Sequence, residues 1–271
     1  LTRKLIGYVS FVRGENPYAF PYRIYPDTFN PEFSLSSISY PKIQLNNNNI
    51  MEPLKYIPVY LNNIGEYQLK GYNYIINQIK TKKNVNNSDI PNFENMQSFG
   101  YTLLEKPLQA LDIVYPNPEF DEIINNTNNN TNPENIIKGI VGKQGLKNIM
   151  NYTTTELLRY NFEYKSDILT KYGRIFNLDI LQKYSGKITS ICKSILKSKG
   201  IVMVYSQYID GGIVPIALAL EELGFTRYGS ATYTKPLFKT PPSEPIDSIT
   251  MKPFNNSKNK QAKYVILTGD K

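Results

Sequence analysis

The stretch IVMVYSQYIDGGIVPIALALEELGF, residues 201–225, decides the fold that the sequence predicts. It opens with the unbroken apolar run 201–205, which is typical of a strand that is buried on both faces, as in parallel sheets. The run breaks at Ser206-Gln207-Tyr208. A helix is then predicted from Val214 to Leu223, because proline is tolerated in a first turn and Gly224 is suited to a C-cap.

The sequence on either side extends this pattern. Residues 185–200 predict a helix with one apolar stripe, capped at its start by Ser185 and at its end by Gly200. After a loop rich in Pro, Ser and Asn, the run 263–267 predicts a second buried strand. A strand, a crossover helix and a second strand in one sheet form a right-handed parallel unit. The fold class expected for this part is therefore α/β, built around a parallel β-α-β unit.

Parallel strands end at the same edge of a sheet, and ligands of open α/β sheets collect there. Polar side chains, glycines and the free N–H groups of a helix start suit a phosphate at that edge. The residues expected to bind nucleic acid are Ser206, Gln207, Tyr208, Gly211, Gly212, Gly269, Asp270 and Lys271.

The charge distribution favours the same type of ligand. The chain has 271 residues and a formal net charge of +8, and residues 181–271 hold 13 Lys/Arg against 6 Asp/Glu. Four lysines occupy or follow the polar side of the 185–200 helix: Lys187, Lys193, Lys197 and Lys199. A localised positive field suits a polyanion such as nucleic acid, although lysine-rich surfaces also serve solubility.

Several kinds of site are excluded by composition. There is no histidine, so the common zinc sites and every histidine-dependent triad are ruled out, and with one cysteine no intrachain disulfide can form. Cys192 lies on the apolar stripe of its helix, which predicts a buried small side chain. We expect no metal site and no catalytic residue in this chain.

The chain before residue 181 is predicted to be mostly helical, with asparagine-rich loops. We divide the sequence into a connector at 1–40, a helical insertion at 41–180 and the α/β part at 181–271. Aromatics and arginine in the connector either pack onto a core or clamp single-stranded bases.

No stretch reaches the roughly 18 to 20 apolar residues of a membrane span, and no basic-then-apolar leader opens the sequence. We therefore expect an intracellular protein that is not secreted and has no membrane partner. Because Leu1 comes first and Gly269-Asp270-Lys271 follows directly on an apolar run, the sequence is expected to be a piece of a longer protein.

Three blocks carry a resemblance to a known family: KLIGYVSFVRGENPYAFPYRIYP at 4–26, LQKYSGKI with ILKSKGIVMVYSQYIDGGIVPIALALEELGF at 181–225, and YVILTGDK at 264–271. They resemble the helicase-like ATPases of nucleocytoplasmic large DNA viruses. These are relatives of poxvirus nucleoside triphosphate phosphohydrolase I and of the small subunit of the early transcription factor.

The resemblance implies two RecA-like lobes around an ATP cleft, of which this chain spans the inter-lobe region and the start of the second lobe. YSQY at 205–208 lies where the family has a phosphate-binding motif, so Ser206 and Gln207 are implied contacts, with Tyr208 a weaker one. Gly269 and Asp270 are implied to lie near the nucleic-acid track or the lobe interface. The resemblance also implies viral transcription machinery as a partner and the infected-cell cytoplasm or the virion as the location.

The sequence departs from the family's ATP-binding pattern. It has no G-x-x-x-x-G-K-[ST] string, and GKQGLKN at 142–148 does not supply one. DEII at 121–124 imitates a magnesium-binding box but lies between prolines and an asparagine tract, so we interpret it as accidental. ATP and magnesium are expected to bind the parent protein, and this chain alone is not expected to hydrolyse ATP.

Two other functions remain open at this stage. One is a non-catalytic DNA-binding module of a viral transcription-factor subunit, which would be distinguished by degenerate motor motifs in the flanking sequence. The other is a flavodoxin-like nucleotide-binding enzyme, which fits the β-α-β pattern but not the charge asymmetry.

Overall fold

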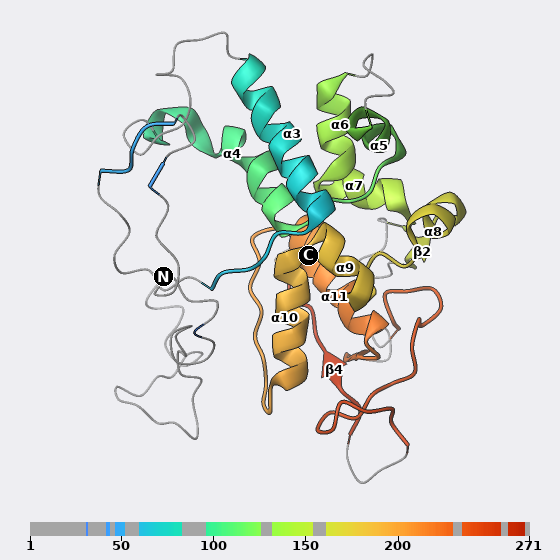
Figure 1. Ribbon diagram of the computed structural model, residues 1–271. Helices are drawn as coiled ribbons and strands as arrows, with labels where there is room; N and C mark the ends of the chain where they lie inside the picture. The colour runs from blue at the N-terminus through green and yellow to red at the C-terminus, as the bar shows by residue number, and fades with distance from the viewer. Residues whose placement is uncertain are drawn as a thin grey trace, which may run out of the picture. The chain divides into compact units, whose positions relative to one another are not determined.

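The structure is a computed structural model, shown in Figure 1 with the element labels used below. It describes Pro31 and residues 42–43, 47–51, 60–82, 96–125, 132–153, 161–229, 235–255 and 260–268; for 96–103 only the backbone is described. The chain forms two compact units, residues 1–61 and 62–271, and each is treated by itself. The predicted connector at 1–40 lies outside the described residues, apart from Pro31.

The described part of the first unit is small. It contains an antiparallel bridge between Ile43 and Asn49, and the Ile50 N–H donates to the Lys42 carbonyl over 2.8 Å. Asn47 has a φ of 67°, a left-handed conformation that asparagine tolerates better than most residues.

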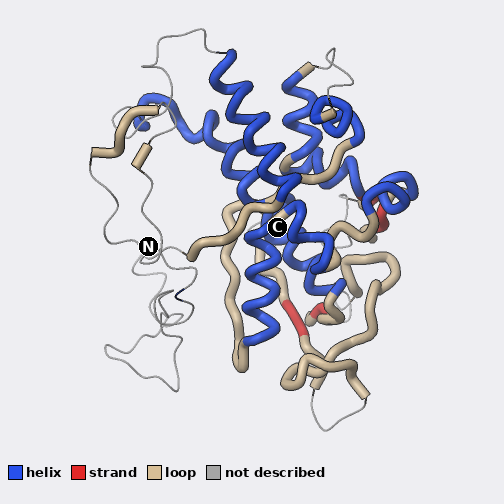
Figure 2. Tube along the Cα trace, viewed as in Figure 1, coloured by secondary structure: helices blue, strands red, loops and turns tan. Residues whose placement is uncertain are grey.

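The described part of the second unit is mixed, with many helices and a few very short strands, as Figure 2 shows. The helices are α3 (Glu66–Lys82), α4 (Met96–Asp112), α5 (Pro118–Ile124), α6 (Pro133–Ile140), α7 (Gly142–Ile149), α8 (Ser166–Tyr172), α9 (Leu178–Tyr184), α10 (Gly186–Lys197), the π-helix η3 (Ile209–Ile213) and α11 (Val214–Glu222). The strands are β1 (Met150–Asn151), β2 (Glu163–Tyr164), β3 (Thr226–Arg227) and β4 (Lys263–Tyr264). None of the helices in the described residues is long and apolar enough to cross a bilayer.

Local sequence explains several helix boundaries. The side-chain oxygens of Asn117, Asn132 and Asn177 accept backbone N–H groups at the starts of α5, α6 and α9. The Ser185 hydroxyl accepts the Ile188 N–H at 3.0 Å, which confirms the predicted cap of α10. Some of the asparagines that mark loops in the sequence therefore also start helices.

The pairing of strands differs from the prediction. β1 and β2 pair antiparallel, and β3 and β4 pair parallel, with Thr226 opposite Lys263 and Arg227 opposite Tyr264. The predicted strand at 201–205 is wrong, because the segment is not part of any sheet in the described residues. Of the second predicted strand, 263–267, only Lys263 and Tyr264 are strand, and their neighbour is β3.

The C-terminal end of α10 also differs from the prediction. α10 ends at Lys197 with Ser198 as its C-cap, three residues before the glycine assigned to that role. Gly224 does follow α11 with a φ of +92°, and its N–H donates to Glu221 at 3.0 Å. Gly224 is thus the predicted helix-ending glycine, while Gly200 is not.

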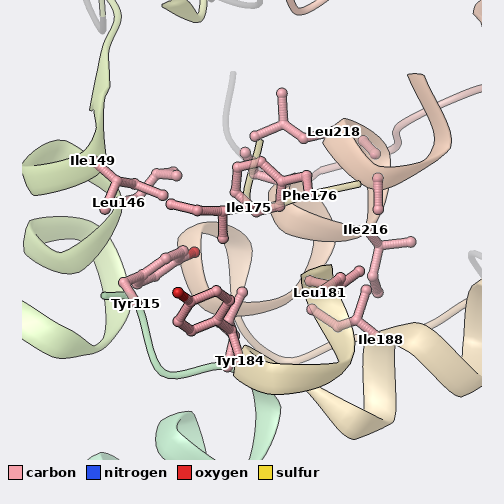
Figure 3. Close-up of a cluster of buried hydrophobic side chains, with 14 of the residues drawn as sticks. Tyr115, Leu146, Ile149, Ile175, Phe176, Leu181, Tyr184, Ile188, Ile216 and Leu218 are labelled. Atoms are coloured by element: carbon pink, nitrogen blue, oxygen red, sulfur yellow. The ribbon is translucent and has the colours of Figure 1, made fainter. Parts of the chain in front are cut away.

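The core of the second unit extends across residue 180. Tyr115, Tyr184 and Ile188 are buried together with side chains of α7 and α11, and Figure 3 shows this cluster. Every residue of α11 is buried, which is expected for its first part, Val214–Leu220, because that part is apolar on all sides; Glu221 and Glu222 at its end are buried as well. Residues 62–180 and 181–268 therefore share one apolar core.

Candidate nucleic-acid interface

The outer face of α10 is basic. Ile188, Cys192 and Ile195 are buried on one side of the helix, and Lys193 and Lys197 lie one turn apart on the exposed side. Lys199 follows the helix end and is also exposed. Between Asp179 and Asp210 the sequence has five lysines and no carboxylate. We call Lys193, Lys197 and Lys199 the lysine face.

None of these three lysines has an ion pair with a described residue, which is also true of most other lysines of the described structure. Lysines near the end of a helix also complement its partial negative charge. The lysine face is thus a compact positive surface that is open to an anionic ligand.

The segment 201–208 turns back from the end of α10 and runs along this helix (Figure 1), so that Tyr205 and Ser206 line the same cleft as Ile191. Its apolar residues are largely exposed. Ile201 is fully exposed, and Met203 and Tyr205 are 91% and 87% exposed. The backbone of 201–205 has no hydrogen bond with the described residues. A strand needs ladder partners, and this segment has none among them.

Inward-facing and outward-facing side chains alternate along 201–205 as they would in a strand, although the segment is not in a sheet. Val204 packs against the core, whereas its neighbours Met203 and Tyr205 point outward. The same pattern follows β4, where Ile266 packs on the core and Val265 and Leu267 are exposed. Both runs were predicted to be buried on two faces, and both are covered on one face only.

Ser206 is half-buried and bonded within its own turn. Its hydroxyl accepts the Tyr208 N–H at 3.2 Å and lies 3.1 Å from the Tyr208 carbonyl, to which it donates. A hydroxyl has one hydrogen to donate. Ser206 therefore shapes the turn, and it would have to give up an internal bond to donate to a phosphate.

The glycine pair has a structural role at this turn. A Cβ on Gly212 would lie 2.0 Å from the Ser206 Oγ, so only glycine lets the two come this close. Gly211 and Gly212 are buried within η3, which starts at Ile209, and α11 continues it directly. The prediction that a helix begins after the glycines is corrected accordingly: the oxygen that approaches Gly212 belongs to Ser206.

Of the other predicted residues of this turn, Gln207 is exposed and Tyr208 is half-buried, as Ser206 is. Burial and the nearby carboxylates of Asp112 and Glu105 raise the pKa of Tyr208, so this hydroxyl stays protonated at neutral pH. Gln207 and Tyr208 thus offer neutral hydrogen-bonding groups at the surface.

η3 is anchored from below by Tyr115. Its hydroxyl donates to the Asp210 carbonyl over 2.5 Å, and the ring is fully buried. The Asp210 carboxyl is partly buried, and burial raises its pKa although Lys143 and Lys147 act in the opposite direction. The turn that carries the predicted residues is therefore attached to the core through its backbone.

A cleft of about 280 Å³ opens between α4, α10 and the turn 205–208. Its walls are mostly apolar and include Leu108, Leu111, Ile191 and Ile216. Lys187 and Asp112 lie at the same cleft and form an ion pair over 2.5 Å, in which the Asp112 side chain is 16% exposed and the Lys187 side chain 44%.

The three remaining predicted residues, Gly269, Asp270 and Lys271, lie outside the described residues. Thr268, the last described residue before them, is exposed. The juxtaposition of Ser206-Gln207 with Gly269-Asp270 stays a prediction.

Sequence inspection missed the residue that holds α3, α4 and α10 together. The buried Gln68 donates from Nε2 to the carbonyls of Ala110 and Leu111 at 2.9 and 3.0 Å. Its Oε1 accepts the N–H groups of Gly65 and Gly186, both at 3.1 Å. A glutamine in an ordinary amphipathic helix gives no sequence signal for this role.

Asp121, at the start of the DEII string, is a structural residue. Its carboxylate accepts the hydroxyls of Tyr67 and Tyr172 at 2.9 and 2.6 Å and pairs with Lys171 at 2.8 Å. Among the described residues there is no group of His, Cys, Asp and Glu that could hold a metal ion. The tyrosine and lysine partners of Asp121 tie α5 to α3 and α8.

Cys192 is fully buried, as predicted, and burial raises the pKa of its thiol to about 12. A thiol with so high a pKa is a poor nucleophile at neutral pH.

No protein-family model, no curated protein and no solved structure matches this chain. The resemblance to viral helicase-like ATPases therefore has no support beyond the residues that carry it.

Proposed function

We propose that this chain is the nucleic-acid-binding part of an ATP-dependent helicase or translocase of a large DNA virus, and that it grips the sugar-phosphate backbone along the lysine face and the adjoining turn 205–208. The observation that carries the proposal is the lysine face itself: three exposed lysines without ion pairs to described residues, at the helix along which the segment 201–208 runs with its exposed aromatic and polar side chains.

Each of these parts has a place in backbone binding. Lysines neutralise phosphates and release counterions, which makes the affinity depend on salt. Exposed Tyr205 supplies a ring on which a base can stack, and Gln207 supplies a neutral donor. The combination of lysines and an exposed tyrosine favours a single strand as ligand.

The fold proposed for this region is a partial RecA-like lobe. It is supported by the order α10, extended segment, α11, β3 and by the parallel pairing of β3 with β4. ATP and magnesium would bind to other parts of the parent protein, since the P-loop string is missing here.

The same missing string favours a second candidate, a non-catalytic DNA-binding module of a viral transcription-factor subunit. An intact P-loop before this region and an arginine motif after it in the parent protein would favour the motor. Degenerate versions of both would favour the module.

The lysine face is tested with two triple variants of equal charge. Changing Lys193, Lys197 and Lys199 to Gln is expected to weaken single-strand binding about tenfold or more at 0.1 M salt. It should also reduce the slope of log affinity against log salt by about 2, since each phosphate contact contributes about 0.7. Binding is measured by fluorescence anisotropy over a salt series.

The matched control changes three exposed lysines elsewhere in the second unit to Gln: Lys138, Lys235 and Lys252. It removes the same net charge. Because these lysines do not belong to the lysine face, the salt slope of this control should stay near that of the unchanged chain. Equal losses in both variants would show that only overall charge matters, and the proposed surface would be wrong.

The turn is tested separately. Gln207→Ala is expected to weaken binding by about three- to fivefold, the loss of one hydrogen bond. Ser206→Ala should have a smaller effect, because its hydroxyl is bonded to Tyr208. An affinity that is unchanged when both are replaced would remove the turn from the proposed track.

A further inference from the structure

We propose that the cleft between α4, α10 and the turn 205–208 receives one unstacked nucleobase of the bound strand, while the phosphates stay outside the cleft. This inference rests on the proposed function and adds the chemistry of the group that enters the cleft.

The size of the cleft limits what can occupy it. Its volume of about 280 Å³ is slightly below the roughly 300–1,000 Å³ of small-molecule sites. It has room for one ring system but not for a dinucleotide.

The chemistry of the walls favours a planar and largely apolar group. Leu108, Leu111 and Ile191 form apolar surface, and Ile216 contributes from α11. Tyr205 lines the cleft and is 87% exposed, so its ring is free to stack on a base.

The charges at the cleft favour a neutral group inside it. The Asp112 carboxylate and the Lys187 ammonium both line the cleft and form an ion pair with each other, so neither charge is left over for a phosphate there. A neutral base therefore fits inside, and its phosphate stays outside.

A matched pair of oligonucleotides tests this assignment. An intact single strand and a strand with one central abasic site carry the same phosphates, so any difference in affinity comes from the base. The 271-residue chain is expected to bind the intact strand about tenfold more tightly, in line with the contribution of one stacked base.

Leu108→Trp should fill the cleft from a position that is 38% exposed, with little demand on the core. It is expected to abolish the preference for the intact strand and to leave the affinity for the abasic strand unchanged. Leu169→Trp is the control, because Leu169 is 40% exposed on α8 and does not line the cleft. It should keep the tenfold preference.

Tyr205→Ala provides a second variant. It shortens an exposed side chain, so the cleft does not have to accommodate a larger one. It should lower the affinity for the intact strand severalfold and leave that for the abasic strand unchanged.

The outcomes separate the two proposals. Equal affinity of the unchanged chain for both strands would overturn the base cleft and leave phosphate binding standing, whereas no binding of either strand would overturn both. If N-acetyl-phenylalaninamide displaces the base better than a free nucleoside does, the cleft belongs to a peptide side chain and the inference is wrong.

Discussion

The two helices that frame the candidate site treat their charges in opposite ways. At the end of α11, Glu221 is 3% exposed, and its carboxylate accepts the N–H groups of Leu237 and Phe238 at 2.7 and 3.0 Å and the Tyr264 hydroxyl at 2.6 Å. On the outer face of α10, the three lysines of the lysine face have no ion pair with a described residue. The two helices thus differ: the charge of α11 is bonded within the fold, whereas the charge on and just after α10 is available to a ligand.

Glu222 repeats the pattern of its neighbour. Arg174 Nε lies 3.1 and 3.0 Å from the two carboxylate oxygens, and the Tyr164 hydroxyl donates at 3.2 Å. A carboxylate at the C-terminal end of a helix opposes the helix dipole, and burial adds a desolvation cost. These donors offset part of that cost, and the pair fixes the loop 235–255 and the segment around β2 to α11. The comparison teaches that buried charge here serves the fold, and that exposed charge without ion pairs is where a ligand is to be sought.

The largest effect is expected from breaking the buried side of the comparison. Glu221→Ala removes the acceptor of three donors and should lower the free energy of unfolding by about 3 kcal/mol. Urea unfolding followed by circular dichroism measures this loss. Glu244→Ala, at an exposed position, should change it by less than about 0.5 kcal/mol, and similar losses in both variants would contradict the structural role.

The next effect concerns the close approach of the turn to η3. Gly212→Ala places a methyl group against the Ser206 Oγ and is expected to cost about 2 kcal/mol of unfolding free energy. Because the clash is with that hydroxyl, the double variant with Ser206→Gly should recover about half of the loss. A double-mutant cycle in urea measures the coupling, and additive losses would show that the contact is not the cause.

A smaller effect distinguishes the carboxylates of Asp121 and Glu221 by their opposite dependence of stability on pH. Burial pushes the pKa of Asp121 up, but donors from Lys171, Tyr172 and Tyr67 outweigh it, and the pKa falls below its ordinary 3.8. Its contribution to stability is therefore present above that value and is lost as the pH falls through the lowered pKa. Asp121→Asn should make the loss of stability between pH 5 and pH 2 shallower than in the unchanged chain.

Glu221 has the opposite sign. Burial raises its pKa above 4.5, so its titration contributes stability below that value that is lost as the pH rises through the raised pKa. Unfolding free energies of both variants across pH 2 to 7 check the two signs. A steeper acid loss in Asp121→Asn than in the unchanged chain would contradict the first.

The smallest effect on stability is expected at the lysine face. Replacing its three lysines by Gln should change the unfolding free energy by less than about 0.5 kcal/mol, because the side chains are exposed and lack ion pairs with described residues. Chemical denaturation of the same triple variant used for binding checks this. A large loss would assign these lysines to the fold and weaken the proposal that they serve a ligand.

Some features were readable from residue order alone. The stripe of α10, its Ser185 cap, the helix Val214–Glu222 and the buried Cys192 follow from periodicity and from short-range geometry, in which each signal acts within about one helical turn. The pairing of β3 with β4 did not follow, because a two-residue strand has no period to detect. The exposure of 201–205 could not be predicted either, because an apolar run does not show which other part of the chain packs on it.

The sequence by itself determined where charge accumulates and which helices have a buried stripe, because composition and period are local properties. Only the tertiary structure decided that Ser206 bonds within its own turn, that Gly212 makes room for that hydroxyl and that Leu108 and Asp112 meet Lys187 at one cleft. The last of these contacts joins residues of separate helices, and which residues meet depends on how the whole chain fills its core at close packing.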